Sequence, residues 1–255
     1  MDLGIAGLRV LVTAGASGIG RETVEAFLEE GAQVFTCDVD GAALATLPDT
    51  VGRVVADVTD RAAVSSLFEA ATQAMGGLDV LVNNAGIAGP TGPVEEINPE
   101  DWDRCLQVCL TSQFNCARLA VPHLRRSDNP SIINMSSAAG QFGFALRSPY
   151  AAAKWGVIGF TKSLSIELGE ADIRVNAILP GLVAGDRQRR VLEAKAQRRG
   201  LPFAEVEKAA FSYTSIKSYV SARQLADQIL FLCSPRGRSI SGQAIAVDND
   251  MRMLA

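Results

Sequence analysis

Histidine is almost absent from this sequence: the 255 residues contain one, His123. Metal sites built from several imidazoles, and the H-E-x-x-H motif of metalloproteases, need two or more. A Ser-His-Asp relay would have to use His123 as its base, and the G-x-S-x-G motif that would supply its serine is missing. We therefore predict no metal site, interpret His123 as a surface or interface residue, and expect another residue type to transfer protons.

Cysteine is scarce and shows no paired spacing. The five cysteines are Cys37, Cys105, Cys109, Cys116 and Cys233, and no C-x-x-C motif occurs. An odd number in a chain of this length argues against a disulfide framework and fits a reducing compartment. Cys105, Cys109 and Cys116 recur close to one helical face, where buried thiols usually act as small apolar groups; a redox or metal role is the alternative.

Long apolar runs and an excess of positive charge are also missing. No run approaches the roughly 18 apolar residues that a membrane span needs, and the N-terminus lacks the basic and apolar regions of a signal peptide. The formal net charge is −4, which provides no basic field for binding nucleic acid. We expect a cytoplasmic protein that binds neither nucleic acid nor a membrane.

What is present is an alternation of short buried β-type runs and longer amphipathic segments. Strands are predicted at 9–13, 33–38, 53–56, 80–83, 131–135, 174–179 and 244–247, and helices at 18–30, 60–75, 99–124, 149–169 and 221–233. This order predicts an α/β fold of the Rossmann type, a doubly wound, seven-stranded parallel sheet with helices on both faces. No linker or repeat interrupts it. We predict one domain, 1–255, with a polar helical insert at about 186–220.

Ligands of such sheets bind beyond the carboxyl ends of the strands, where the strand order reverses. The first strand runs there into T-A-G-A-S-G-I-G, residues 13–20. Glycines that open a helix let a pyrophosphate approach its N-terminus, although tight turns also use glycine without any ligand. Because the turn joins the first strand to the first helix, we favour a dinucleotide site. Its candidate residues are Gly15, Ser17, Gly18, Ile19 and Gly20.

Asp38 ends the second predicted strand, 18 residues after Gly20. A carboxylate at this position accepts hydrogen bonds from the adenosine ribose and repels a 2′-phosphate. The glycine turn contains no Arg or Lys, and Val39 follows Asp38. The sequence therefore favours NAD over NADP. A helix N-cap is the alternative role, and it fits Asp40 better.

Tyr150 and Lys154 lie four residues apart at the start of a predicted helix, on one face. A phenol is a poor base at neutral pH, and a neighbouring ammonium group lowers its pKa by stabilising the phenolate. Ser137 follows the fifth strand and is placed to hydrogen-bond a substrate carbonyl or hydroxyl. We predict that these three residues are catalytic.

Five motifs in order give the chain a resemblance to the short-chain dehydrogenase/reductases over nearly its whole length. They are the glycine turn, N-N-A-G at 83–86, Ser137, Y-x-x-x-K at Tyr150 and Lys154, and Pro180-Gly181. The interval of 13 residues to Tyr150 selects Ser137 rather than Ser136.

The resemblance implies a homo-oligomeric oxidoreductase, most commonly a tetramer, that uses NAD(P). It implies that Tyr150 is the general acid and base, that Lys154 binds the nicotinamide ribose, and that Ser137 holds the reacting oxygen. It also assigns cofactor contacts: Asp57 and Val58 to the adenine, Asn83, Ala85 and Gly86 to the adenosine side, and Pro180, Gly181 and Val183 to the nicotinamide.

Three positions depart from the family pattern. Ala14 replaces the first glycine of the turn, and Gly185 replaces a threonine that contacts the cofactor. Cys109 replaces an asparagine that supports a water-mediated proton path from the lysine. A thiol is a weak donor and acceptor, so a slower or rerouted proton relay is expected.

Substrate contacts are expected from the loop after Ser137 and from the insert. Phe142 and Phe144 are candidates for an apolar wall, with ordinary core packing as the alternative. The insert carries eight cationic and four anionic side chains, a net charge of +4. We predict that Arg147 and Arg187 contact a carboxylate or phosphate of the substrate; a solvated helical face is the alternative.

The function predicted from these features is NAD(H)-dependent oxidation of a small secondary alcohol or reduction of its ketone. Candidate substrates include carboxylate- or phosphate-bearing, sugar-acid or polyol-like compounds. Two alternatives stay open: a weakly active NAD-binding regulatory or scaffold protein, which the three departures favour, and an NADP-dependent carbonyl reductase, which Asp38 disfavours.

Overall fold

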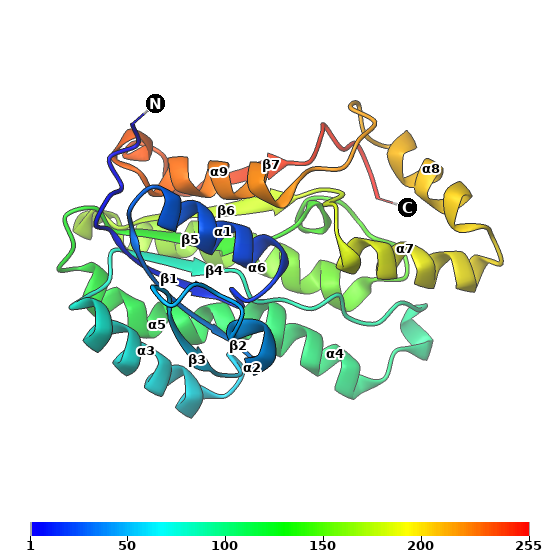
Figure 1. The fold of residues 1–255 in the computed structure, drawn as a ribbon. Coiled ribbons are helices and arrows are strands. Elements are labelled where there is room, and N and C mark those ends of the chain that lie inside the picture. Colours follow the sequence, from blue (N-terminus) through cyan, green and yellow to red (C-terminus); the bar gives the residue numbers. More distant parts are fainter. Residues whose placement is uncertain (1, 255) are drawn as a thin grey trace.

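The computed structural model describes residues 2–254 and confirms the predicted doubly wound sheet (Figure 1). Seven parallel strands lie in the order β3-β2-β1-β4-β5-β6-β7. They are β1 (Arg9–Thr13), β2 (Gln33–Asp38), β3 (Gly52–Val55), β4 (Val80–Asn83), β5 (Ser131–Met135), β6 (Arg174–Pro180) and β7 (Ala244–Val247). The order reverses between β1 and β4, which places a crevice at their carboxyl ends.

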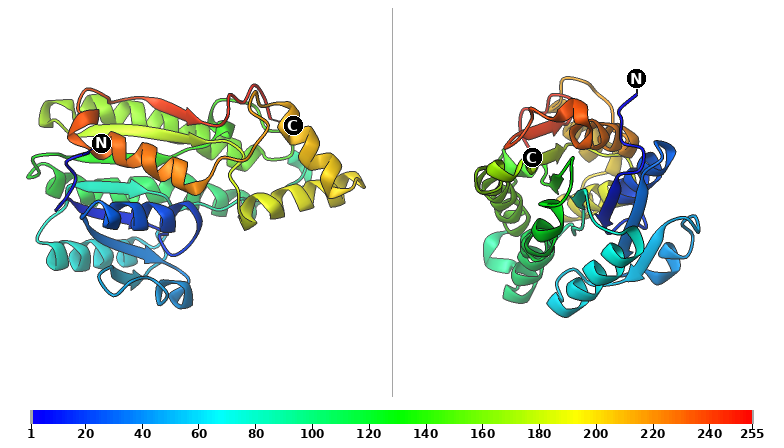
Figure 2. Two further views of the ribbon diagram at one scale, coloured as in Figure 1. Left: turned by 45° about the horizontal axis from the view of Figure 1, so that its top comes forward. Right: turned by 90° about the vertical axis from the view of Figure 1, so that its left-hand side faces the viewer.

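Helices cover both faces of the sheet, as the end-on view of Figure 2 shows. They are α1 (Gly18–Glu29), α2 (Gly41–Leu44), α3 (Arg61–Met75), α4 (Pro99–Leu106), α5 (Ser112–Leu124), α6 (Ser148–Glu167), α7 (Asp186–Arg199), α8 (Phe203–Ser212) and α9 (Ala222–Cys233). The side chains of β1 alternate between the two cores: Val10 and Val12 pack in the core that contains Phe27 of α1, and Leu11 in the core that contains Leu67 of α3. Alternate side chains of β1 therefore contribute to the two cores, as expected for a strand that is buried on both faces.

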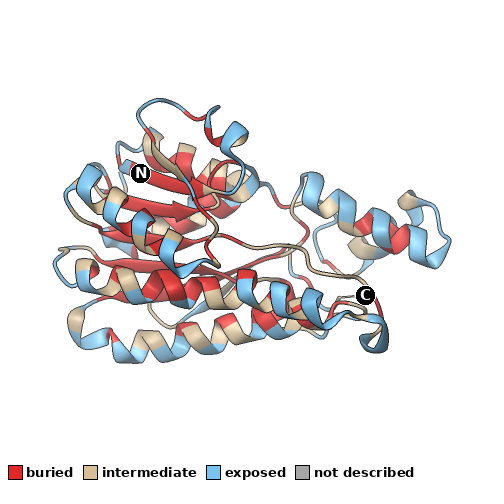
Figure 3. Ribbon diagram, turned by 90° about the horizontal axis from the view of Figure 1, so that it is seen from below, coloured by how far each residue is buried: buried red, intermediate tan, exposed pale blue. Residues whose placement is uncertain are grey.

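Burial follows this layering. In Figure 3 the strands are largely buried, while the outward surfaces of the helices and most of α7 and α8 are exposed. All five cysteines are buried and free. No helix among residues 2–254 is long and apolar enough to cross a membrane.

Residues 99–124 are helical, as predicted, but do not form one regular α-helix. They consist of α4 and α5 joined by a π-helical turn, Gln107–Thr111. Such a turn inserts one residue into the helical repeat, and it is frequent at functional sites.

The predicted insert forms two helices, α7 and α8, beyond the carboxyl edge of the sheet. Figure 2 shows them extending away from the strands, next to the C-terminal segment. The other predicted elements agree with the structure within a few residues at each end: the third strand is Gly52–Val55, for example, and Ser221 is the N-cap of α9.

Candidate active site

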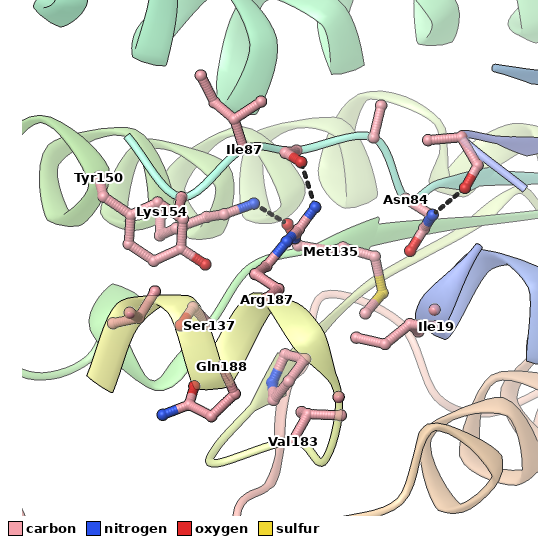
Figure 4. Close-up of a pocket in the computed structure, with 18 of the residues that line it drawn as sticks. Ile19, Asn84, Ile87, Met135, Ser137, Tyr150, Lys154, Val183, Arg187 and Gln188 are labelled. Atoms are coloured by element: carbon pink, nitrogen blue, oxygen red, sulfur yellow. Dashed lines mark hydrogen bonds between the residues drawn. The ribbon is translucent and has the colours of Figure 1, made fainter. Parts of the chain in front are cut away.

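A cavity of about 870 Å³ lies along the carboxyl ends of the strands. Figure 4 shows its centre, with Tyr150, Lys154 and Ser137 on one side and Ile19 and Val183 on the other. Most of the predicted site residues line it: Ser17, Gly18, Ile19, Gly20, Asp38, Asp57, Val58, Ala85, Gly86, Ser137, Phe144, Arg147, Tyr150, Lys154, Pro180, Gly181, Val183 and Arg187. Three do not, namely Gly15, Asn83 and Phe142.

The glycine turn leaves space at the N-terminus of α1. A Cβ atom on Gly18, whose φ is +55°, would meet no atom within 4 Å, so the cavity reaches its backbone. Ser17 is the N-cap, and its side chain caps no N–H group of the helix. The first N–H groups of α1 therefore face the cavity without an internal partner, an arrangement that suits an anion.

Two glycines of the turn have packing roles instead. A Cβ atom on Gly20 would lie 2.2 Å from the Ala14 carbonyl oxygen, and one on Gly15 would lie 2.1 Å from Thr36 Oγ1. Gly15 thus packs the turn against β2, outside the cavity. Ala14 has a φ of +55°, so this L-residue occupies the left-handed region where the family has glycine.

Asn84, rather than Asn83, faces the cavity. Its Nδ2 donates to the carbonyl oxygens of Thr13 (3.0 Å) and Ala14 (2.9 Å) and ties β4 to the glycine turn. Asn83 is the last residue of β4, is buried, and donates to Asn134 Oδ1 at 2.9 Å. Asn83 does not line this cavity because its side chain joins two strands within the sheet, and its contact with the adenosine side stays a prediction.

The far end of the cavity is acidic. Asp38 accepts from the Ala16 N–H at 3.2 Å through Oδ2 and from the Asp40 N–H at 3.1 Å through Oδ1, which fixes its carboxylate beside the glycine turn. Asp40 caps α2 through the Ala43 N–H, as predicted. The cavity lining near these residues includes one cation, Arg104 of α4, which was not predicted.

Asp57 follows β3 and pairs with Arg104. Its Oδ1 accepts from the N–H and hydroxyl of Thr59 at 2.9 and 2.7 Å, and its Oδ2 lies 3.2 Å from Arg104 Nη2. Burial raises the pKa of the carboxyl group, but the hydrogen bonds from Thr59 and Arg104 outweigh it and hold the pKa below its usual value. The carboxylate is therefore charged and paired.

Tyr150 and Lys154 lie on adjacent turns at the start of α6. Lys154 is buried, its Nζ donates to the Met135 carbonyl oxygen at 2.7 Å, and it lies 5.6 Å from the centre of the Tyr150 ring. Ser137 lies two residues after the end of β5, and its hydroxyl accepts from the Ala139 N–H at 3.2 Å. Ser136 is more buried and donates to the Lys154 carbonyl oxygen at 2.8 Å, which fixes it as part of the scaffold.

Cys109 stands in the π-helical turn beside Lys154. Its Sγ accepts from the Ile87 N–H at 3.4 Å and donates to the Ile87 carbonyl oxygen at 3.5 Å. A Cβ atom on Gly86 would lie 3.6 Å from Lys154 Nζ and 3.8 Å from Cys109 Sγ, so the thiol and the ammonium group are neighbours. A hydrogen bond from Cys105 lowers the pKa of Cys109; burial opposes this, and the charge of Lys154 adds to it.

Three of the four residues predicted to contact the substrate line the cavity. Phe144 and Arg147 face the cavity next to Tyr150, whereas Phe142 packs with Ala138, Leu182 and Met251. The ring of Phe142 belongs to a small apolar cluster, which fits the alternative of ordinary core packing, and it does not line the cavity. Arg187 lines the cavity and donates to the Gly86 carbonyl oxygen (Figure 4).

Two other sequence features have clear positions. Gly185 has a φ of +136°, which L side chains rarely adopt, so the threonine of the family pattern would be strained here. His123 lies late in α5, outside the cavity lining, with its Nδ1 3.1 Å from Arg126 Nη2. Among residues 2–254 no cluster of three or more His, Cys, Asp or Glu side chains is arranged to hold a metal ion.

Comparisons with known proteins agree with this geometry. The family described as "Enoyl-(Acyl carrier protein) reductase" matches residues 13–251. The chain is 35% identical over 248 residues to the 3-oxoacyl-[acyl-carrier-protein] reductase FabG of Thermotoga maritima, which covers 94% of this chain and 96% of that one. It is 34% identical over 244 residues to the D-beta-hydroxybutyrate dehydrogenase of Cupriavidus necator, covering 92% and 94%. The solved structure of L-sorbose reductase from Gluconobacter frateurii, in complex with NADPH and L-sorbose, has a TM-score of 0.89 at 28% identity, with 98% of both chains covered.

Proposed function

The chain belongs to the short-chain dehydrogenase/reductase family and is an oxidoreductase of CH–OH and C=O groups, and from this premise we propose that it uses NAD(H) and acts on a small secondary alcohol or its ketone. The observation that carries the proposal is the single cavity wall that Ser137, Tyr150 and Lys154 share, opposite the open N-terminus of α1. Tyr150 would act as the acid–base group in this chain, whose single histidine lies outside the cavity lining.

The cavity fits a dinucleotide. The N-terminus of α1, with open space at Gly18, would hold the pyrophosphate. Asp38 would accept hydrogen bonds from the adenosine ribose, and its charge would repel a 2′-phosphate. Asp57 and Val58 would border the adenine, and Pro180, Gly181 and Val183 would flank the nicotinamide. When bound, the nicotinamide supplies the hydride acceptor or donor.

The residues of the chain manage the proton and the orientation. Tyr150 accepts the hydroxyl proton of the alcohol during oxidation and returns a proton to the carbonyl oxygen during reduction. Ser137 holds that oxygen through a hydrogen bond. Lys154, fixed by the Met135 carbonyl oxygen, places a positive charge beside the phenol, and this charge favours the phenolate form.

We also propose the assembly and the setting of the protein. A homotetramer is favoured by large apolar side chains exposed on α5 and α6, where Phe114 is 45% and Trp155 is 52% exposed. Five free, buried thiols fit the cytoplasm. The chain would be one catalytic domain, with 186–220 acting as a lid over the substrate end of the cavity.

Absorbance at 340 nm tests the main proposal. The enzyme is incubated with NAD or NADP and a panel of secondary alcohols, polyols, hydroxy acids and steroids, and reduced cofactor is measured. We expect turnover with NAD and a smaller kcat/KM with NADP. Tight binding of NAD without turnover on the whole panel would support the regulatory alternative. A preference for NADP, the cofactor in the L-sorbose reductase complex, would support the NADP-dependent alternative.

Cys109→Asn is expected to raise kcat by roughly threefold to tenfold, a fraction of what a complete acid–base group contributes. The amide would provide a stronger donor and acceptor than the thiol next to Lys154. Steady-state kinetics and the solvent isotope effect on kcat measure the change. Cys109→Ala is the matched control and should not accelerate the reaction. Equal acceleration in both variants would show that the thiol obstructs the site, and would contradict a relay limited by its weak hydrogen bonding.

A further inference from the structure

Arg147 is an arginine buried inside the active-site cavity. It lies three residues before Tyr150 and is 2% exposed. One nitrogen of its guanidinium group, Nη2, donates to the Ala88 carbonyl oxygen. Nε and Nη1 are buried and have no hydrogen-bond partner within the described residues. A buried cation with unused donors is unfavourable by itself, so this site calls for an acceptor with negative charge.

The neighbours of Arg147 are mainly aromatic. Its Cζ lies 5.3 Å from the centre of the Phe144 ring and 5.2 Å from the centre of the Tyr150 ring. These ring faces stabilise a cation, but they do not replace an oxygen acceptor for the unused N–H groups. The guanidinium is thus held in place beside the proposed acid–base residue.

A second cation approaches from the insert. Lys195 of α7 is 5% exposed, and its Nζ lies 4.3 Å from the centre of the same Phe144 ring. Burial lowers the pKa of Lys195 to about 8, and the positive charges of Arg147 and Arg199 contribute to the shift. Two buried cations, one from the loop before α6 and one from α7, therefore converge on one side of the cavity.

The acidic residues of the cavity lie elsewhere. Asp38, Asp40 and Asp57 are at the end assigned to the adenosine, and Asp186 begins α7. Arg147 forms no ion pair with any described residue. The negative charge that would balance Arg147 is therefore expected from a ligand.

We propose that Arg147 and Lys195 bind the carboxylate of a short hydroxy or oxo acid whose hydroxyl or carbonyl group reaches Tyr150. A carboxylate is a planar acceptor that suits a guanidinium group, and the ammonium of Lys195 adds a second point of charge. Leu192 and Phe144 border the remaining space, which favours a small, largely apolar body. This inference rests on the proposed function and narrows its substrate class, and it replaces Arg187 by Lys195 as the second anion-binding residue.

The test pairs short hydroxy acids with their uncharged methyl esters. In the wild type, kcat/KM is expected to be at least about 50-fold higher for the best acid than for its ester. Arg147→Met should raise KM for the acid by about 50-fold or more, and Lys195→Met by about tenfold, with KM for the ester within about twofold. Arg147→Lys should recover part of the affinity. Lys208→Met, which removes an exposed charge from the same insert, is the matched control and should change neither substrate.

Binding of the oxo acids to the NAD-loaded protein, which cannot reduce them, is measured separately by calorimetry. This arm does not need turnover, so it separates the inference from the proposed function. Loss of oxo-acid affinity in Arg147→Met and Lys195→Met, but not in Lys208→Met, supports the site even if every alcohol fails as a substrate. Equal losses for acid and ester would make Arg147 a structural residue and overturn the inference. Tighter binding of phosphorylated ketones than of oxo acids would overturn the choice of a carboxylate.

Discussion

Tyr150→Phe is expected to lower kcat for alcohol oxidation by about 10³-fold while NADH affinity changes by less than about twofold. The substitution removes one oxygen atom from a half-buried side chain whose ring keeps its contacts with Arg147 and Lys154. The phenol is the group proposed to accept the hydroxyl proton, so its loss should remove acid–base catalysis. Kinetics at 340 nm measure kcat, and NADH fluorescence measures binding without catalysis.

Tyr213→Phe is the matched control for this prediction. Tyr213 also lines the cavity, at the end of α8, and loses the same oxygen atom. It should retain kcat within about threefold, because it lies outside the group formed by Ser137, Tyr150 and Lys154. Similar kcat values for Tyr150→Phe and the wild type would exclude Tyr150 as the acid–base group, and would turn attention to Cys109 and Lys154.

The sheet could be predicted because its strands and helices are recognisable from short stretches of the sequence. Most strands are short runs of largely buried residues, and the helices between the strands impose a parallel arrangement, so the strand ends must meet at one edge. Tyr150, Lys154 and Asp38 were predicted from their places at that edge or at a helix start. For these residues, position along the chain determines position in space.

Other parts of the site depend on tertiary contacts that no sequence spacing reveals. Asn83 and Asn84 are adjacent in one motif, yet the side chain of Asn83 bonds within the sheet and that of Asn84 lines the cavity. Phe142 and Phe144 are two residues apart in one loop, and only Phe144 faces the cavity. Such choices follow from the packing of several elements at once.

The burial of Lys195 likewise could not be predicted from the sequence. The insert reads as a polar helical face, and most of its cations are exposed, including Arg189, which pairs with Glu193. Lys195 is buried because α7 turns that side toward Phe144 and Arg147. The net charge of the insert pointed to an anion, but the structure was needed to separate the buried cation from the solvated ones.

The choice of cofactor gives the second large expected effect: Asp38→Asn should raise kcat/KM for NADP by about 100-fold. The asparagine keeps an oxygen that can accept from the Ala16 N–H, so the change removes mainly the negative charge that would face a 2′-phosphate. kcat/KM for NAD should fall by about tenfold, since a hydrogen bond from a ribose hydroxyl to a neutral amide is weaker than one to a carboxylate. Initial rates with both cofactors measure the ratio.

Adding Val39→Arg should extend the change, because Val39 is 66% exposed at the acidic end of the cavity and a guanidinium there has room to pair with the 2′-phosphate. Asp40→Asn is the matched control: it removes an equal charge two residues away, from a carboxylate that caps α2. If Asp40→Asn raised kcat/KM for NADP as much as Asp38→Asn, cofactor choice would follow the general field of this end of the cavity. If Asp38 instead acts through a specific contact, kcat/KM for NADP should rise in Asp38→Asn and not in Asp40→Asn. That result would show that the carboxylate at the end of β2 causes the preference for NAD.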